Sequence, residues 1–214
     1  MTSSQMRAPF SATAVASWFV DRVAADSEQD LSNLKLQKLL YLAQSLYLSR
    51  FQVSLVEEPF QAWENGPAVK AVYGQFKDFG AAPIILHKNV LATRNWPEPV
   101  EQTLMDIWTC FGGYSAWKLR DITHQAGPWK EHWRPGLRNI EIPNTEIRDA
   151  WPDFVKYAET PLVARTNNTS AALSRYAAVL ADSKTRKRSG DMAGLEAESL
   201  ETETLRRRAS STLS

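Results

Sequence analysis

Two side chains capable of acid–base chemistry, Asp121 and His124, lie three residues apart in a segment with helical character. Residues at this spacing share one face of a helix, so the carboxylate could orient the imidazole as in a general acid–base pair. His132 follows next to Glu131, close enough in sequence to join them. This arrangement supports one hypothesis, a small hydrolase-type enzyme centred on Asp121 and His124.

The motifs that usually complete a catalytic or metal site do not occur in the sequence. It contains no Gly-x-Ser-x-Gly turn, no His-Glu-x-x-His motif and no Walker-type glycine loop. Asp121, His124 and His132 are too few ligands to close a structural metal site. We therefore expect no catalytic residue, no metal and no cofactor.

The single cysteine and the candidate histidine both have simpler structural explanations. Cys110 lies between Trp108 and Phe111 without a second cysteine, so we expect a buried small hydrophobic residue. His124 precedes Pro128 and Trp129, and we expect its partly buried imidazole to bond a backbone carbonyl and fix that turn.

The elements that must position these residues are mainly helices. Leu36, Leu39, Ala43, Leu46 and Tyr47 recur at the spacing that places apolar side chains on one helical face. Similar patterns and end signals predict the other helices, with Pro67 and Pro97 in first turns and glycines after last turns. The predicted helices cover residues 11–23, 31–50, 67–79, 97–111 and 116–125, and a last one begins near 142–147.

A small antiparallel β element is expected beside the helices. Residues 51–63 contain β-branched and aromatic residues interrupted by Pro59, which favours one or two short extended pieces. The run Ile84 to Leu86 could pair with them. The fold class is therefore mainly α, a compact multi-helix domain with a small antiparallel β element.

The composition of the chain changes sharply near Arg165. All eight Trp and all eight Phe occur before it, and Tyr176 is the only aromatic residue after it. Residues 1–164 contain 16 basic and 18 acidic side chains, whereas residues 165–214 contain 9 and 6. We expect a globular domain over 1–164, and a charged Ser-, Ala-, Glu- and Arg-rich extension over 165–214, flexible or helical, that buries too little apolar surface to fold alone.

Three features in order along the chain resemble a known family. They are the amphipathic helix at 34–49, the segment 62–67 with the helix that follows it to Gly80, and the residues Asp121, His124, Pro128 and Trp129. Together they resemble the Panacea domain, a bacterial and phage family, over about residues 10–158.

The resemblance implies a non-enzymatic antitoxin of a toxin–antitoxin pair that neutralises a co-encoded protein toxin by binding it. A relative of this class acts as an adaptor that delivers its toxin to the ClpXP protease. Direct blocking and proteolytic delivery therefore both stay open. The resemblance brings no catalytic residue.

Tryptophans in polar surroundings are the best candidates for contacts with a partner. Trp129 and Trp133 bracket a polar stretch in which complete burial is difficult, and large aromatic residues are common binding anchors. His124, Trp63 and Glu64 are further candidates. The default expectation for the tryptophans as a group, Trp117 and Trp151 included, is burial in the core.

Nucleic-acid binding and membrane attachment are disfavoured. The domain is slightly acidic, and no helix carries a Lys/Arg stripe with base-reading polar residues, although the clusters at 184–188 and 206–208 leave a DNA-binding autoregulator as an alternative. No segment is long and apolar enough to span a bilayer, and residues 1–10 do not read as a signal peptide. We therefore expect a cytoplasmic protein. The sequence does not predict its oligomeric state.

Overall fold

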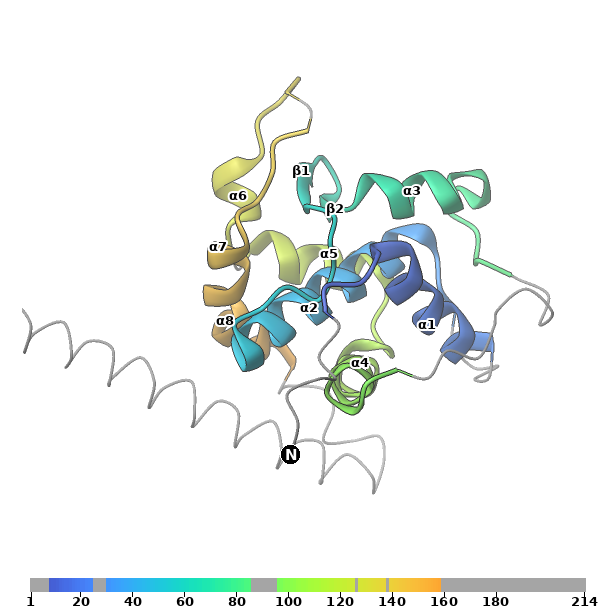
Figure 1. The fold of residues 1–214 in the computed structure, drawn as a ribbon. Helices are drawn as coiled ribbons and strands as arrows, with labels where there is room; N and C mark the ends of the chain where they lie inside the picture. Colours follow the sequence, from blue (N-terminus) through green and yellow to red (C-terminus); the bar gives the residue numbers. More distant parts are fainter. Residues whose placement is uncertain (1–7, 25–29, 86–95, 126, 138, 159–214) are drawn as a thin grey trace, which may run out of the picture. The chain divides into compact units, whose positions relative to one another are not determined.

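A computed structural model describes residues 8–24, 30–85, 96–125, 127–137 and 139–158 of the chain (Figure 1). These residues all belong to one compact unit, Met1–Ala172, whereas the second unit, Leu173–Ser214, and the extension predicted at 165–214 lie outside them. The described elements are α1 (Ala12–Ala24), α2 (Asn33–Phe51), β1 (Gln61–Trp63), β2 (Gly66–Ala68), α3 (Lys70–Phe76), a 3-10 turn (Lys77–Phe79), α4 (Glu98–Phe111), α5 (Ala116–Gln125), α6 (Trp129–His132), α7 (Asn144–Asp149) and α8 (Trp151–Ala158). The fold is mainly helical with a two-stranded antiparallel sheet, which confirms the predicted class.

Helix α2 lies at the centre of this unit (Figure 1). It contacts α1, α3, α4, α5, α7, α8 and strand β2. The predicted apolar face is buried, but the opposite side of the helix is buried as well, because other elements cover it. The prediction of a single buried face was therefore too narrow. α2 is a core helix, and its polar residues Gln37, Lys38 and Gln44 are inside the protein.

The buried polar side chains of α2 bond backbone groups of the loops around it. The Gln44 side-chain oxygen accepts hydrogen bonds from the backbone N–H groups of Leu55 and Val56, at 3.0 and 3.2 Å. The Gln37 side-chain oxygen accepts one from Val69 N–H at 2.8 Å. Burying a polar group costs free energy unless the group is hydrogen-bonded. Here each glutamine side-chain oxygen accepts hydrogen bonds from backbone N–H groups of a loop.

The small sheet is a hairpin that sequence analysis placed partly in a helix. Ala62 pairs with Pro67, and Trp63 with Gly66, so Pro67 belongs to β2 rather than to the first turn of α3. Gly66, the first residue of β2, has a φ of +97°, which only glycine adopts readily, so the chain turns back into a second strand here and the helix begins only at Lys70. The predicted helix start at Pro67 was therefore wrong.

The other extended segments also pair differently from the prediction. Ile84 N–H bonds the Leu31 carbonyl at 2.8 Å, so the segment at 84 meets the entry to α2 and not residues 51–63. The partner of β1 on its other side is the segment before α7, where Ala62 N–H bonds the Ile140 carbonyl at 2.8 Å. Leu86 lies outside the described residues.

Helices α4 and α5 follow their sequence signals closely. α4 begins after Pro97 and α5 spans Ala116–Gln125, as predicted. Cys110 is buried, in agreement with its expected role, and so is Trp151. Trp117 is 62% exposed on α5, which corrects the expectation that it is in the core. None of the helices in the described part of the chain is long and apolar enough to cross a membrane.

Candidate functional site

The three segments that resemble the Panacea domain meet at one place in the fold. Lys38 of α2 lies under the hairpin, and its Nζ donates a hydrogen bond to the Pro67 carbonyl at 2.7 Å. A Cβ atom on Gly66 would lie 2.6 Å from Lys38 Nζ and 3.0 Å from His124 Nε2. A side chain at this position would therefore displace the end of Lys38, crowd His124 and strain the backbone.

Lys38, which is buried, and Arg120 and His124, which are partly buried, form what we call the basic cluster. Arg120 and His124 are one turn apart on α5, and Arg120 Nε and His124 Nε2 are both buried without a hydrogen-bond partner among the described residues. Burial lowers the pKa of Lys38 well below its usual value, and the nearby positive charge of Arg120 lowers it further. The cluster thus places basic nitrogen atoms close together where water has little access to them.

The same environment keeps His124 neutral near pH 7. Burial lowers the pKa of His124 from 6.5 to about 4, Arg120 and Lys38 add to the shift, and Asp121 opposes it. The expected hydrogen bond from His124 to a backbone carbonyl is not formed at Nε2. Instead the imidazole stacks on the Trp129 ring, with ring centres 3.5 Å apart and an angle of 11°.

Stability should therefore fall as the pH falls from 6.5 towards 4. In this window the unfolded chain binds a proton at His124 that the folded chain does not, so unfolding is favoured as the pH falls. We expect His124 to contribute about 1–2 kcal/mol of this loss, less than the full shift implies because the ring is only partly buried. Urea unfolding at pH 7 and pH 4.5 should show a smaller loss for His124→Phe, which keeps an aromatic ring next to Trp129. Equal losses in the variant and the unchanged protein would contradict this assignment.

An aromatic strip runs over the hairpin from α3 to α6. It consists of Tyr73, Trp63, Trp129 and Trp133. Trp63 packs edge-on against Tyr73 at 5.0 Å, Trp129 Nε1 donates a 2.7 Å hydrogen bond to the Trp63 carbonyl, and Trp129 stacks on Trp133 at 5.5 Å. Helices α3 and α6 lie on either side of the hairpin (Figure 1).

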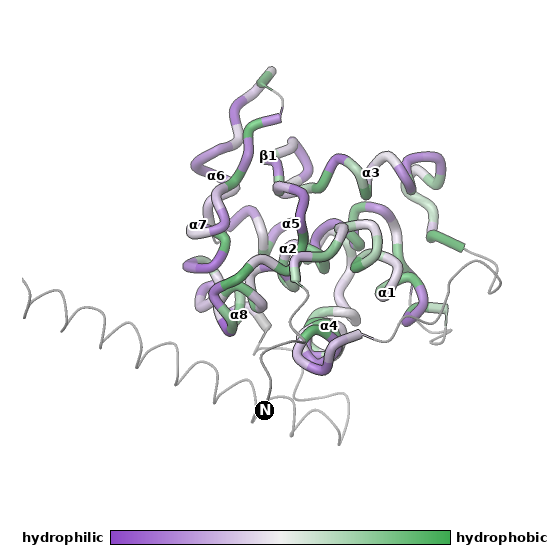
Figure 2. The backbone as a smooth tube through the Cα atoms, viewed as in Figure 1, coloured by the Kyte–Doolittle hydropathy of each residue, from purple (hydrophilic) through white to green (hydrophobic). Residues whose placement is uncertain are grey.

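The strip is open to solvent at three of its four residues. Tyr73 is 45% exposed, Trp63 and Trp133 are half-buried, and Trp129 is buried between its neighbours and His124. α6 and the loop after it are largely hydrophilic along the chain (Figure 2), so the tryptophans stand among polar residues. An apolar, ordered strip with polar surroundings can bind another protein.

The fold brings together the residues that sequence analysis named as partner-binding candidates. Trp63, Trp129 and Trp133 belong to the strip, His124 lies beneath it, and Glu64 is exposed at the hairpin turn. Three residues of the strip and the basic cluster, Lys38, Tyr73 and Arg120, were not among those candidates. The sequence did contain one signal for Lys38, because a lysine interrupts the apolar pattern of the predicted helix at 31–50.

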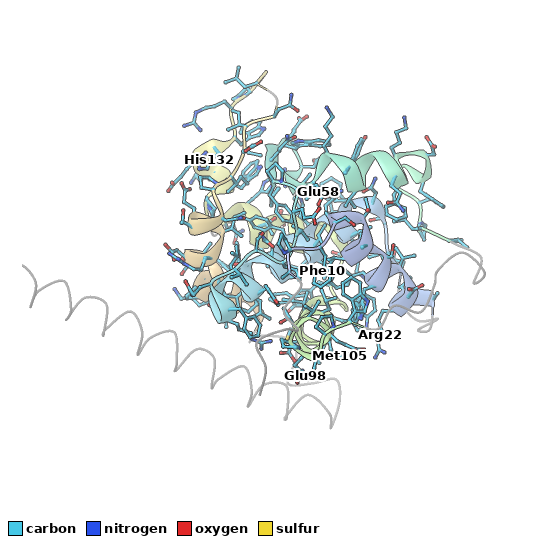
Figure 3. The ribbon with its side chains drawn as sticks, in the orientation of Figure 1. Phe10, Arg22, Glu58, Glu98, Met105 and His132 are labelled. Atoms are coloured by element: carbon cyan, nitrogen blue, oxygen red, sulfur yellow. The ribbon has the colours of Figure 1, made fainter. Side chains whose placement is uncertain are left out.

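The acid–base pair proposed at Asp121 and His124 is not assembled. Asp121 is exposed and accepts a 3.3 Å hydrogen bond from Arg120, whereas His124 Nε2 has no hydrogen-bond partner among the described residues. His132, labelled in Figure 3, instead has its Nε2 2.8 Å from Glu146 Oε2. Within the described ranges no group of three or more His, Cys, Asp or Glu side chains could hold a metal ion.

Comparison with known proteins points to one family. A family model described as "Antitoxin SocA-like, Panacea domain" matches residues 36–130, a range that contains Lys38, the hairpin, His124 and Trp129. Antitoxin SocA of Caulobacter vibrioides (strain NA1000 / CB15N) is 33% identical over an alignment of 132 residues, and the alignment covers 55% of this chain and 68% of that antitoxin. No solved structure matches the chain.

Proposed function

The chain belongs to the family of SocA-like antitoxins with a Panacea domain, and we propose that it acts in the cytoplasm as a non-enzymatic antitoxin that binds and neutralises a co-encoded protein toxin. The observation that carries the proposal is the aromatic strip, which presents Trp63, Tyr73 and Trp133 to solvent. Glu64, Lys130 and Glu131 are exposed around it and supply a polar rim.

The strip is suited to binding because its side chains are already ordered. The Trp63 ring packs against Tyr73, the Trp63 backbone carbonyl accepts a hydrogen bond from the Trp129 indole N–H, and the Trp133 ring stacks on Trp129. Aromatic residues lose little conformational entropy on binding, and residues held in place before binding lose still less. A toxin that covers this apolar area can therefore gain binding free energy without the entropic cost of ordering a loop.

Replacement of Trp63 or Trp133 with alanine is expected to weaken toxin binding by about tenfold to a hundredfold, as loss of a central aromatic anchor usually does. Calorimetric titration of the full chain with the protein encoded by the neighbouring gene would measure the change. Trp117→Ala is the matched control, because Trp117 is an exposed tryptophan outside the strip, at the start of α5. Equal affinities for all three variants and the unchanged chain would rule out the strip as the contact.

Stoichiometry separates an antitoxin that binds from an enzyme that acts on the toxin. A binding protein protects cells or a toxin assay only at about one chain per toxin molecule, whereas an enzyme protects at a small fraction of that amount. We expect the first result. The Asp121→Asn protein should also retain full protection, because the Asp121 carboxylate is exposed and its hydrogen bond in the described part of the chain is to the neighbouring Arg120.

We also propose that residues 165–214 decide what happens to the bound toxin. The domain makes the first contact through the strip, and an extension can supply a second attachment, at high effective concentration, for a protease component such as ClpX. The level of toxin in cells with and without ClpXP distinguishes the two mechanisms. Toxin that accumulates in an inactive complex in both strains indicates blocking, and toxin that disappears only when ClpXP is present indicates delivery.

A further inference from the structure

The hairpin that carries Trp63 is held from below by side chains of α2. Lys38 Nζ bonds the Pro67 carbonyl at 2.7 Å, and the Gln37 side chain bonds both Val69 N–H and, more weakly, the Val69 carbonyl, at 2.8 and 3.4 Å. Pro67 pairs with Ala62 across the hairpin, next to Trp63. Lys38 therefore holds the strand pair at a position next to Trp63.

Lys38 is an unusual choice for this role because its position is unfavourable for a basic group. The residue is 1% exposed, and within the described part of the chain no carboxylate lies at ion-pair distance from its Nζ. The charged side chain that adds to the lowering of its pKa is Arg120, which is also positive. A buried basic group without a counter-charge usually destabilises the folded state, and a methionine would fill the same volume without this cost.

Lys35 provides a comparison on the same helix. It is also buried, and its Nζ lies 3.6 Å from Oδ1 of Asp30, which precedes α2. The two lysines thus share type, helix and burial. They differ in what they bond: Lys35 is near a carboxylate, and Lys38 holds a backbone carbonyl of β2.

We propose that Lys38 is a positioning residue for toxin binding, which holds the β1–β2 hairpin against α2 so that Trp63 stays aligned with Tyr73 and Trp129 in the aromatic strip. The inference rests on the proposed function of the strip. It assigns Lys38 no contact with the toxin, since the side chain is buried under Pro67 and beside His124.

The test compares Lys38→Met with Lys35→Met in the full chain. In Lys38→Met we expect an unchanged or higher denaturation midpoint, at least tenfold faster hydrogen exchange of the amides at 61–69, and about tenfold weaker binding to the protein encoded by the neighbouring gene. In Lys35→Met we expect hairpin exchange and affinity equal to those of the unchanged protein. A purely structural residue would show affinity and stability falling together.

Hydrogen exchange makes the test independent of the toxin. If the unchanged chain does not bind the neighbouring protein, the proposed function fails, while faster hairpin exchange in Lys38→Met still supports the positioning role. If the unchanged chain binds and Lys38→Met matches it in both exchange and affinity, the inference is wrong. A Lys38→Met protein that does not fold would also contradict it, because the proposal gives Lys38 no part in forming the core.

Discussion

Replacement of Leu39 with alanine is expected to lower the free energy of unfolding by about 2–5 kcal/mol, the range for a large-to-small change in a rigid core. Leu39 is 0% exposed in the middle of α2, and elements on all sides of this helix prevent the neighbours from collapsing into the space. Urea denaturation followed by tryptophan fluorescence would measure the loss.

Leu34→Ala is the control for this experiment. Leu34 lies on the same helix and is only partly buried, so the same change in volume should cost clearly less. An unchanged midpoint for Leu39→Ala would mean that the apolar side of α2 is not enclosed, and the same reasoning applies to Leu40.

Replacement of Asp106 with alanine is expected to cost about 3–5 kcal/mol, because it leaves a buried guanidinium without its counter-charge. Arg50 NH2 and Asp106 Oδ2 are 2.6 Å apart, and the two side chains are 13% and 5% exposed. Gln102 donates a 2.7 Å hydrogen bond to the other carboxylate oxygen. The pair joins the end of α2 to α4, so its loss should be seen in the same denaturation experiment.

Two comparisons test the origin of that cost. Asp149→Ala removes a carboxylate from an exposed pair with Arg148 and should change stability by about 1 kcal/mol or less. The double change Arg50→Met with Asp106→Leu removes both charges and should restore much of the stability lost in Asp106→Ala. A double variant as unstable as Asp106→Ala would show that packing, and not the uncompensated charge, sets the cost.

The sequence predicted the elements whose ends are marked by local chemistry. α4 and α5 were placed correctly because a proline, first-turn acidic residues and terminal glycines act within a few residues of the chain. The start of α3 was misplaced because proline is compatible with a first helical turn and with a hairpin strand. The strand is favoured at Pro67 by Gly66 and by two α2 side chains, which bond Pro67 and Val69. These two side chains lie about 30 positions earlier in the chain.

The candidate site could be predicted residue by residue but not as an arrangement. Trp63, His124, Trp129 and Trp133 were named from their types and local surroundings, and their part in binding a toxin stays a prediction. The contact that joins them, an indole N–H on the carbonyl of a residue 66 positions away, has no local signal. Trp117 was wrongly predicted to be buried, because the sequence around an exposed tryptophan on a helix does not differ from that around a buried one.

The central position of α2 also affects how the protein can fold while it is being synthesised. Gln44 and Ser45 form their bonds to Asn144 and Ile147, which the ribosome adds 100 and 102 residues later. At roughly 5–20 residues per second, about 5–20 s pass between the synthesis of these partners. During that time the apolar surface of α2 is without its final cover, so a nascent chain is open to chaperones and proteases until α7 has been made.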